Sequence, residues 1–367
     1  MKIVLVCGAR PNFMKIAPLL TAMGKSGYSF NPLLVHTGQH YDYNMSRAFF
    51  EDLELPEPDI HLGIGAGTHG EQTGRTLIEF EKVLFKEKPN LVVVVGDVNS
   101  TLAAALAAVK LQIPVSHIEA GLRSFDLTMP EEVNRLLTDH ISDYLFTPSP
   151  DANANLKREG TPDEKIHFVG NIMVDCLLAN IEKAKRRPIP AGLNLPEKGY
   201  AVLTLHRPAN VDVPETLDRL LGSILDVARM IPVVFPVHPR TRKRLEESGF
   251  IGKLAAESNR LLLIEPLRYL DFISLLLRSK FVMTDSGGVQ PETTTLGIPC
   301  LTLRDSTEWT VTVTQGTNIL VGDKAADLVT RVTEIMASSV TRKQRPPDRW
   351  DGKTASRIVD ILKKALK

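Results

Sequence analysis

Two carboxylates in the first half of the chain follow short apolar runs, at positions that suit acid–base chemistry. Asp97 comes after the run in "VVVVGDVNST", and Glu119 comes with His117 at the end of the run in "VSHIEAGLRS". If these runs are buried strands, the carboxylates at their ends are poorly solvated. Poor solvation raises their pKa values and suits them to act as general acids or bases. Structural roles stay open for both, because Asp97 can cap the next helix and Glu119 can pair with Arg123.

A further acidic pair lies in "TMPEEVNR", which indicates the start of a helix. Pro130 suits a first helical turn, and Glu131 and Glu132 are favoured at the positive end of the helix dipole. Arg135 follows Glu131 at a spacing that allows the two side chains to pair. The pattern by itself therefore favours a structural role for both glutamates.

Basic residues follow the apolar run at the N-terminus, in "GARPNFMKIAP". Gly8 permits a tight turn, and Arg10 and Lys15 flank the start of the following helix. A helix N-terminus with nearby cations attracts phosphate. The alternative is an ordinary surface arginine and lysine. The spacing matches neither the dinucleotide-binding fingerprint nor a P-loop.

Two pairs of histidine and arginine in the second half also follow apolar runs. "AVLTLHRPAN" contains His206 and Arg207, and "FPVHPRT" contains His238 and Arg240. A histidine after a strand is often a buried residue with satisfied hydrogen bonds. Because both histidines are closely followed by an arginine at the same predicted sheet edge, the pattern indicates an edge that binds anions.

The segment "TDSGGVQPE" completes this predicted edge. Ser286, Gly287 and Gly288 join an apolar run to a helix, so their amides and hydroxyl suit a phosphate, with a plain tight turn as the alternative. Glu292 lies in or just after the first helical turn, where a carboxylate can accept two sugar hydroxyls. These patterns predict a phosphorylated or nucleotide-carried substrate. The second half of the chain would hold it, and the first half would supply proton chemistry.

The elements that must position these residues are strands and helices in regular alternation. Apolar runs predict strands at Ile3–Cys7, Leu33–His36, Leu91–Val95, Val115–Ile118 and Tyr144–Thr147, and again at Tyr200–Leu205, Val233–Val237, Leu261–Ile264, Phe281–Thr284 and Cys300–Leu303. Amphipathic stretches predict helices at about 11–26, 42–53, 69–87, 98–110 and 130–140, and then at 214–230, 239–248, 269–278, 288–296, 324–337 and 352–366. Continuous apolar strands alternating with helices indicate parallel sheets. With the loop "KRRPIPAGLNLPEKG" between the two sets, they predict two doubly wound α/β domains.

The composition excludes several classes of protein. The 367 residues include 44 basic and 43 acidic side chains and a net charge of +1, so there is no basic excess that would favour nucleic acid. Cys7, Cys176 and Cys300 are far apart and form no C-x-x-C, which predicts no thiolate metal site and fits a reducing cytoplasm. No stretch of about 18 apolar residues occurs, so no membrane span is expected.

Taken together, the motifs resemble those of the non-hydrolysing UDP-N-acetylglucosamine 2-epimerases over nearly the whole chain. The resemblance is carried by "GARPNFMKIAP", "TGQH", "GDVNST", "HIEAGLRS", "MPEEVNR", "LTDHISDYLF", "HRP", "PVHPRT", "TDSGGVQ" and "GIPCLTLRDSTE". It implies two Rossmann-like domains in a glycosyltransferase-B-like fold, with the active site in the interdomain cleft. The N-terminal domain would comprise residues 1–172 with a returning helix at 350–367, and the C-terminal, UDP-binding domain residues 173–349.

The same resemblance implies the reaction. Members of the family are homodimeric isomerases that interconvert UDP-GlcNAc and UDP-ManNAc without a metal or a nicotinamide cofactor. The proton at sugar C2 is removed and UDP leaves C1 by anti elimination. The bound 2-acetamidoglucal then takes UDP back as C2 is protonated on the opposite face. Such an enzyme would act in the cytoplasm, in the synthesis of cell-surface polysaccharide.

Site roles also follow from the resemblance. It implies acid–base catalysis by Asp97, Glu119 and Glu131, assistance to the departing diphosphate by His206, and support of the charge network by Lys15. It implies UDP-sugar binding by Arg10, Arg135, Arg207, Phe272, Ser286, Gly287, Gly288 and Glu292. Within this set Glu292 would hold the ribose and Phe272 would lie by the uracil. Which carboxylate serves which face of C2 stays open.

Four positions depart from the family pattern. Trp309 in "STEWTVT" replaces an arginine that contacts the diphosphate, and an indole cannot reproduce a guanidinium fork. Pro291 replaces a glutamate, and Asn12 stands where many members have one. Tyr41 departs from the surroundings of an activator site for a second UDP-GlcNAc, so activation by substrate stays undecided. The loss of the arginine keeps open a modified substrate, such as a UDP-diacetamido-uronate.

Other classes of protein share parts of the pattern. A glycosyltransferase would share the fold and the diphosphate-binding turn, although one base rather than three carboxylates would serve it. A hydrolysing epimerase would release ManNAc and UDP. A non-catalytic protein that binds sugar nucleotides would need none of the three carboxylates.

Overall fold

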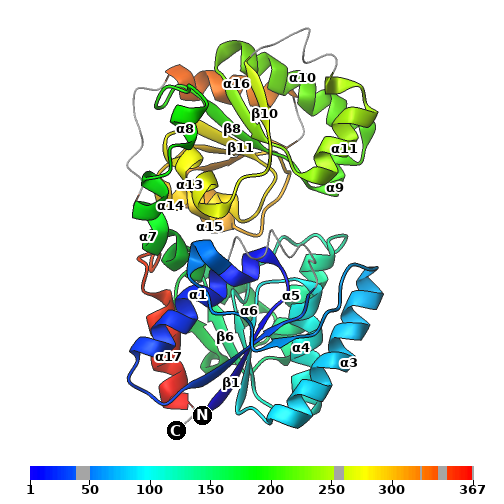
Figure 1. The fold of residues 1–367 in the computed structure, drawn as a ribbon, viewed down its shortest axis with the longest axis vertical. Helices are drawn as coiled ribbons and strands as arrows, with labels where there is room; N and C mark the ends of the chain where they lie inside the picture. Colours follow the sequence, from blue (N-terminus) through cyan, green and yellow to red (C-terminus); the bar gives the residue numbers. More distant parts are fainter. Residues whose placement is uncertain (39–49, 252–259, 323–324, 338–344, 366–367) are drawn as a thin grey trace. The chain divides into compact units, whose positions relative to one another are not determined.

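The chain forms two compact α/β units (Figure 1). The structure is a computed structural model, and it describes residues 1–38, 50–251, 260–322, 325–337 and 345–365. Unit 1 comprises Met1–Ala179 with Asp348–Lys367, and unit 2 comprises Asn180–Pro347. Each unit is built on a parallel sheet, which confirms the predicted pair of doubly wound α/β domains.

The described part of unit 1 contains a sheet of seven strands in the order β3-β2-β1-β4-β5-β6-β7, with all neighbours parallel. The strands are β1 (Lys2–Cys7), β2 (Asn31–His36), β3 (Ile60–His61), β4 (Leu91–Val95), β5 (Val115–Ile118), β6 (Tyr144–Thr147) and β7 (Ile166–Phe168). The helices are α1 (Arg10–Lys25), α3 (His69–Glu87), α4 (Asn99–Lys110), α5 (Pro130–Ile141), α6 (Pro150–Arg158), η1 (Asp163–Lys165), α7 (Ile172–Lys185) and α17 (Thr354–Ala365).

The described part of unit 2 contains a sheet of six strands in the order β10-β9-β8-β11-β12-β13, again parallel throughout. The strands are β8 (Ala201–Thr204), β9 (Val233–Pro236), β10 (Leu261–Ile264), β11 (Phe281–Thr284), β12 (Cys300–Thr302) and β13 (Asn318–Leu320). The helices are α8 (Ile189–Gly192), α9 (Pro208–Val211), α10 (Pro214–Met230), α11 (Pro239–Glu247), α13 (Tyr269–Leu277), α14 (Val289–Leu296), α15 (Thr310–Thr314) and α16 (Ala325–Ala337).

Burial on both faces explains why the central strands carry continuous apolar runs. Every residue of β4, "LVVVV", is buried. In unit 1, α1 packs against α17, while α4 packs against both α3 and α5. Figure 1 shows the first pair on one face of the sheet and α3 and α4 on the other. A strand covered in this way has no solvent face, so the alternation of polar and apolar residues disappears.

Helix α17 belongs to unit 1 although it follows unit 2 in the sequence. It packs against α1. At its N-terminus, the Asp175 carboxylate accepts hydrogen bonds from the amides of Thr354 (3.1 Å) and Ala355 (2.7 Å). Asp175 lies in α7 and so ties the first half of that helix to α17. The division between the units consequently falls after Ala179, a few residues later than the position expected from the sequence.

The sequence predicted the long buried strands better than the short ones. The predicted strands that became β4, β5, β6, β10 and β11 have the observed bounds. The short strands β3, β7 and β13 were missed, as were helices α6, α7, α8, α9 and α15. Most of the helix predicted at 42–53 lies outside the described residues. The missed strands have two or three residues each and are partly exposed, so they lack the apolar run on which the prediction depended.

Both sheets change the direction of their strand order beside the first strand of the unit. β1 lies between β2 and β4, and β8 lies between β9 and β11. Ligands of doubly wound proteins bind at the carboxyl ends of the strands at such a switch point. These ends lead into Gly8 and Gly96 in unit 1, and into His206 and Asp285 in unit 2. The topology therefore directs attention to the residues that follow these four strands.

Candidate active site

The end of β5 carries a buried ion pair. Lys15 Nζ donates a hydrogen bond to Glu119 Oε1 at 2.6 Å, and the two side chains are 5% and 9% exposed. The other oxygen, Glu119 Oε2, has no hydrogen-bond partner in the described part of the chain. Lys15 is therefore not a surface cation. A buried carboxylate that has one oxygen held by a cation and the other without a hydrogen-bond partner is suited to exchange a proton with a ligand.

Glu119 also has an unusual backbone and an unusual environment. Its φ of 76° lies in the left-handed region, which costs a non-glycine residue roughly 1 kcal/mol or more. The amides of Glu119 and Ala120 both donate to the Phe146 carbonyl (3.0 and 3.1 Å), which fixes this conformation. Burial raises the pKa of the Glu119 carboxyl above its ordinary value; Lys15 opposes the shift and Asp97 adds to it. Strained backbone and perturbed pKa values gather at functional sites.

Asp97, at the end of β4, is held by an arginine and does not cap the next helix. The N-cap of α4 is Val98. Asp97 Oδ2 accepts a hydrogen bond from Arg135 Nε (3.1 Å) and forms an ion pair with Nη2 (2.9 Å), and the carboxylate side chain remains 28% exposed. The preceding Gly96 has a φ of 68°, and a Cβ at this position would lie 2.7 Å from Lys15 Nζ. Glycine at position 96 thus makes room for the ammonium group.

Helix α5 supplies Arg135 together with a second carboxylate partner for it. The buried Glu132 pairs with Arg135 and accepts hydrogen bonds from the amides of Ser124 (3.0 Å) and Phe125 (2.8 Å). Residue spacing had suggested Glu131 as the partner and had missed Glu132, whose bonded amides lie seven and eight residues earlier in a loop. Glu131 is partly exposed in the first turn of α5.

Arg123 lies in a separate buried network. Its guanidinium pairs with Asp139 (2.7 Å) and with Glu159 (2.6 Å). The predicted pair between Glu119 and Arg123 is therefore wrong. Lys15 takes the place beside Glu119, and Arg123 turns to partners that lie 16 and 36 residues after it. Spacing along the chain could not identify these partners, because helices α5 and α6 bring them back to the sheet.

The turn after β1 is tied to the end of β4 by Asn12. Its Oδ1 accepts hydrogen bonds from the amides of Gly8 (3.0 Å) and Ala9 (2.9 Å), and its Nδ2 donates to the Val95 carbonyl (3.1 Å). Arg10 begins α1 directly after this turn. The predicted residues of unit 1 thus come from adjacent strand ends, although they are far apart in the sequence.

In unit 2, the ends of β8 and β11 are joined through Asp285. Its buried carboxylate accepts hydrogen bonds from the amides of His206 (3.0 Å) and Arg207 (2.9 Å) and pairs with His206 Nδ1 (2.9 Å). Burial raises the pKa of the Asp285 carboxyl, but the hydrogen bonds and charge of His206 outweigh burial and bring that pKa below its ordinary value. The His206 side chain is 42% exposed, so the ring is oriented by Asp285 and open to a ligand. The sequence prediction missed Asp285, although an aspartate between a strand and Ser-Gly-Gly was a visible signal.

The predicted anion-binding edge is narrower than the sequence suggested. Arg240 pairs with Asp212, and the amide of Arg240 donates to Nδ1 of His238, the N-cap of α11 (3.3 Å). Arg207 instead reaches towards Glu308, with 3.9 Å between Nη2 and Oε1. Glu308 contacts the glycine turn, so Arg207 is the arginine of the two that lies near it.

Ser286, Gly287 and Gly288 form the turn between β11 and α14. Gly288 is the N-cap of α14, so the first amides of the helix face out of this turn. Position 287 requires glycine, because a Cβ there would overlap Oε1 of Glu308. Glu308 is itself buried and paired with Arg304 (2.9 Å). The predicted phosphate-binding turn therefore has a bare backbone and a helix N-terminus, and two arginines stand close to it.

Glu292 and Phe272 are brought together by α13 and α14. Glu292 lies in α14 and is 5% exposed. Burial raises the pKa of its carboxyl to about 8, with the Tyr269 hydroxyl opposing the shift. Tyr269 and Phe272 lie three residues apart on α13 and so share one face of the helix. The Tyr269 hydroxyl thus links Glu292 of α14 to α13, the helix that carries Phe272.

The raised pKa of Glu292 predicts a specific dependence of stability on pH. The ordinary pKa is 4.5 and the folded value about 8, so the folded protein holds a proton that the unfolded chain has lost between these values. Stability is then fully present below the lower value and falls as pH rises through the higher one. The substitution Glu292→Gln removes this loss, which amounts to at most about 5 kcal/mol.

Urea unfolding at about pH 5 and about pH 9 checks this prediction. The free energy of unfolding should fall less between these pH values for Glu292→Gln than for the wild type. Glu215→Gln, which changes an exposed glutamate of α10, is the matched control and should behave as wild type. An equal fall in all three proteins would show that burial of Glu292 does not perturb its ionisation.

The model of the UDP-N-acetylglucosamine 2-epimerase family matches residues 24–363 of the chain. The chain belongs to this family. It is 47% identical to the UDP-N-acetylglucosamine 2-epimerase of Methanocaldococcus jannaschii, over 99% of both chains. It is 45% identical to the UDP-2,3-diacetamido-2,3-dideoxy-D-glucuronate 2-epimerase of Pseudomonas aeruginosa, over 99% of this chain and 100% of that one. The family resemblance that the motifs suggested is thus confirmed.

Solved structures of the 2-epimerase family share the fold. A crystal structure of the M. jannaschii UDP-GlcNAc 2-epimerase in complex with UDP-GlcNAc and UDP has a TM-score of 0.91 and 46% identity, covering 99% of this chain and 100% of that one. Sucrose-phosphate synthase from Thermosynechococcus elongatus has a TM-score of 0.63 at 15% identity. At that identity the likeness to the synthase shows a shared fold alone.

Trp309, which the motifs predicted to depart from the 2-epimerase family pattern, lies beside the glycine turn. The indole is 3% exposed, and its Nε1 is 3.8 Å from the place a Cβ on Gly287 would take. The Trp309 amide donates to Thr307 Oγ1 (3.1 Å), and the Thr307 hydroxyl donates to Gln290 of α14 (2.6 Å). The indole thus forms part of the wall of the turn. Unlike an arginine at this position, its side chain carries no positive charge. Of the other predicted departures, Pro291 lies in the first turn of α14, and Tyr41 lies outside the described residues.

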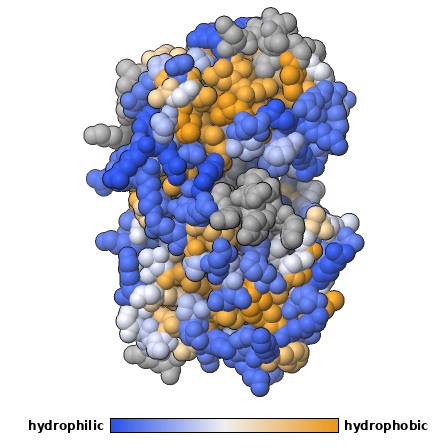
Figure 2. All heavy atoms as spheres, viewed as in Figure 1, coloured by the Kyte–Doolittle hydropathy of each residue, from blue (hydrophilic) through white to orange (hydrophobic). Residues whose placement is uncertain are grey.

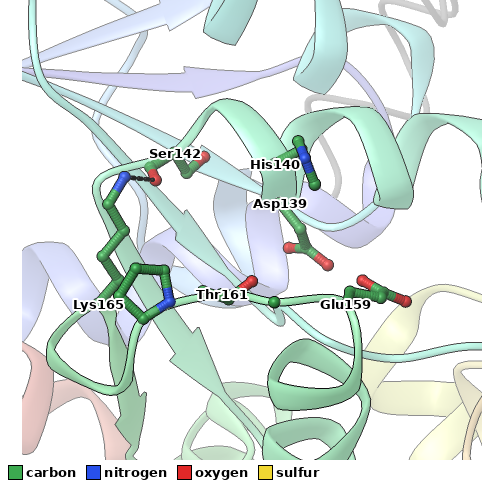
Figure 3. A pocket seen from close by; sticks show the side chains of 8 residues that line it. Asp139, His140, Ser142, Glu159, Thr161 and Lys165 are labelled. Carbon is green, nitrogen blue, oxygen red and sulfur yellow. Dashed lines mark hydrogen bonds between the residues drawn. The ribbon is translucent and has the colours of Figure 1, made fainter.

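A small pocket of about 140 Å³ lies elsewhere in unit 1 (Figure 3). Its lining consists of Asp139, His140, Ser142, Glu159, Gly160, Thr161, Pro162 and Lys165. None of the predicted site residues is among them, but two lining residues belong to the Arg123 network. Across the described ranges, no three His, Cys, Asp or Glu side chains come together as ligands for a metal ion.

Proposed function

We propose that the protein is a UDP-N-acetylglucosamine 2-epimerase that interconverts UDP-GlcNAc and UDP-ManNAc. The observation that carries this proposal is the environment of Glu119. One of its oxygens is held by Lys15, the other has no partner in the described structure, and burial raises the pKa of the carboxyl. Such a group suits removal of a proton from carbon. Relatives that are 47% and 45% identical over nearly their full length are named as 2-epimerases of UDP-sugars.

In the proposed reaction, the C2 proton passes to a carboxylate as the C1–O bond breaks and its electron pair leaves on UDP. This anti elimination forms 2-acetamidoglucal. UDP then adds back to C1 while an acid returns a proton to C2 from the opposite face. Asp97, Glu119 and Glu131 are the groups proposed for these transfers. The net change is inversion at one carbon, so the scheme requires no redox cofactor and no metal.

The nucleotide is proposed to be held by residues of unit 2, with Arg10 from unit 1. The diphosphate would take the amides and hydroxyl of Ser286, Gly287 and Gly288 and the charges of Arg10 and Arg207, while Glu292 would hold the ribose and Phe272 would lie by the uracil. The helix N-terminus at the turn and the burial of Glu292 support this assignment. His206, oriented by Asp285, is proposed to assist the leaving diphosphate.

Proton NMR in deuterated water tests the proposed function. UDP-GlcNAc should be converted to UDP-ManNAc, and both sugars should gain deuterium at C2, because the carboxylates exchange their proton with solvent. Conversion without deuterium at C2, or no conversion at all, would remove the proposal. Free ManNAc accumulating in step with UDP would identify a hydrolysing epimerase instead.

A second candidate substrate is a UDP-2,3-diacetamido-uronate. Trp309 beside the glycine turn favours it, and so does the relative of that specificity, which at 45% is almost as similar as the UDP-GlcNAc epimerase at 47%. A substrate panel with deuterium at C2 as the readout separates the two. Turnover of UDP-GlcNAc with none of the uronate would exclude this candidate, and the reverse result would replace the first.

We further propose that the protein is a homodimer through helices α3 and α5. Large apolar side chains are exposed on both: Ile78 (55%) and Phe85 (61%) on α3, and Val133 (40%) and Leu137 (48%) on α5. Helix α4 packs against both helices, and Figure 2 shows apolar residues gathered over it on the viewed face of unit 1. Contiguous exposed apolar surface of this kind typically marks a contact with another protein chain.

Sedimentation equilibrium tests the dimer. The wild type should have twice the chain mass of 40.5 kDa, and the double variant Ile78→Lys/Leu137→Lys should have the mass of one chain, because two charges would be buried at the contact. Val213→Lys, at an exposed valine of unit 2 (42%), should leave the mass unchanged. A wild-type protein with the mass of one chain, or a double variant that still has twice that mass, would contradict the proposal.

The proposed location is the cytoplasm. No helix in the ranges that the structure covers has the length and apolar character that crossing a bilayer requires. Cys7, Cys176 and Cys300 are buried thiols rather than halves of disulfides, as in proteins of reducing compartments. The proposed role in cell-surface polysaccharide synthesis rests on the family resemblance alone.

A further inference from the structure

His117 lies inside the sheet of unit 1 and takes no part in the reaction scheme above. It belongs to β5, and its side chain is 0% exposed. Ring atom Nδ1 lies 2.6 Å from Asp139 Oδ1, and Nε2 lies 2.8 Å from the carbonyl oxygen of Gly96. The ring therefore joins α5 to the loop that follows β4.

Both partners of this ring accept hydrogen bonds. A carbonyl oxygen has no proton to donate, so Nε2 must carry a hydrogen. The Asp139 carboxylate also accepts from the Gly121 amide (3.0 Å) and from Arg123 Nη1 (2.7 Å). The ion pair with the Arg123 guanidinium favours the charged form of the Asp139 carboxyl, independently of the state of the ring. Asp139 is consequently an anion, and Nδ1 must carry a hydrogen as well, because a neutral ring would turn a lone pair towards an acceptor.

The two hydrogen bonds of the ring end on either side of the proposed acid–base residues. Gly96 directly precedes Asp97, so the bond to its carbonyl fixes the peptide group that carries Asp97. Asp139 holds the amide two residues beyond Glu119. The strained backbone of Glu119 is thereby held by two elements, by the Phe146 carbonyl of β6 and by Asp139 of α5. One imidazole ring connects the supports of both carboxylates.

The rest of the network balances the charge of this ring. Arg123, 1% exposed, lies between Asp139 and Glu159, so two cations face two carboxylates. Glu159 is 27% exposed and reaches the pocket of Figure 3, where its carboxylate and that of Asp139 turn towards the same space. A buried charge without such compensation would be strongly destabilising. The paired carboxylates therefore allow a positively charged ring at this depth.

We propose that His117 is a positioning residue, a ring protonated on both nitrogens that holds the supports of Asp97 and Glu119 by donating to Gly96 and Asp139 at once. The effect of His117 on the reaction rate rests on the proposed epimerase function, whereas the charge state of His117 is a property of the protein without substrate. The rate effect and the charge state can therefore be tested separately.

Nitrogen NMR of the full-length protein, labelled with ¹⁵N in its histidines, tests the charge state. Signals of His117 are assigned by their loss in His117→Gln among the nine histidines of the chain. Both ring nitrogens of His117 should carry protons at neutral pH without substrate. One protonated and one bare nitrogen would overturn the proposal, whether or not the protein turns over any UDP-sugar.

Two substitutions at one position test the positioning role. Asn places its amide nitrogen near Nδ1 and loses the bond to Gly96, whereas Gln places its nitrogen near Nε2 and keeps that bond. His117→Asn should lower kcat by roughly tenfold to a hundredfold with KM unchanged, because a misplacement of about 1 Å in a reacting group can cost that much. His117→Gln loses the bond to Asp139 instead, and it should also lower kcat with KM unchanged.

His140→Gln, at an exposed histidine of α5, is the control and should match the wild type. A wild-type kcat in either His117 variant, or a rise in KM in place of a fall in kcat, would overturn the positioning role. If His117→Asn does not fold, as judged by circular dichroism, the NMR result and His117→Gln decide. A wild-type protein without epimerase activity would contradict the proposed function, but the NMR result on the charge state of His117 would remain valid.

Discussion

Replacing Glu119 by glutamine is expected to lower kcat for epimerisation of UDP-GlcNAc by about 10²- to 10⁴-fold, the usual contribution of a general acid or base. The amide has nearly the size of the carboxyl group and still offers an oxygen to Lys15, but it takes up no proton. The affinity for UDP should change by less than about threefold, because the residues proposed to bind the nucleotide lie in other elements. The loss should therefore appear in kcat alone.

This prediction is checked by NMR measurement of UDP-ManNAc formation together with calorimetric titration of UDP. Glu79→Gln changes a glutamate of α3 whose side chain is 41% exposed, and it should behave as wild type. Thermal unfolding must be recorded as well, because removing the charge that faces a buried lysine costs roughly 3–5 kcal/mol. A folded Glu119→Gln protein that keeps more than about a tenth of the wild-type kcat would exclude Glu119 as the main base.

The second large effect is expected at the glycine turn of unit 2. Gly287→Ala should weaken UDP binding at least about 100-fold, which corresponds to about 3 kcal/mol. The added methyl group would overlap the Glu308 carboxylate, which is buried and paired with Arg304 and so cannot move aside freely. It would also cover the backbone that is proposed to face the diphosphate. A hydrogen bond to a charged group contributes about 1.5–3 kcal/mol, so the loss of two such bonds accounts for this effect.

Calorimetric titration of UDP into the two proteins measures the loss directly. Gly222→Ala is the matched control in the same unit, because a Cβ at that position of α10 meets no atom within 4 Å. The control should bind UDP as the wild type does and should gain a little stability from the better helix former. If Gly287→Ala binds UDP with wild-type affinity, the turn is not the diphosphate site.

Much of the candidate site could be predicted because parallel sheets place function at strand ends. Asp97, Glu119, His206 and the Ser-Gly-Gly turn all follow apolar runs that are visible in the sequence and that became buried strands. No knowledge of tertiary contacts was needed to select them. Within each unit, the topology of the sheet then brings the strand ends of that unit together, as the alternation of strands and helices had predicted.

The partners of these residues could not be predicted in the same way. Lys15 reaches Glu119 across 104 residues, and Asp285 reaches His206 across 79. Pairing by helical spacing considers partners three or four residues away, so it proposed Arg123 for Glu119 and overlooked Lys15. Buried charges take whichever opposite charge the fold brings to them, and that choice depends on packing rather than on sequence distance.

The return of α17 to unit 1 has a consequence for how the protein folds during synthesis. The residues of unit 2 leave the ribosome as one continuous stretch, so this unit can complete its sheet as soon as they have emerged. Unit 1 begins first but must wait, because the helix that covers α1 and takes the Asp175 hydrogen bonds is translated after unit 2. Until then the side of α1 that packs against α17 is uncovered. The half of the protein that is made first is therefore the half that is finished last.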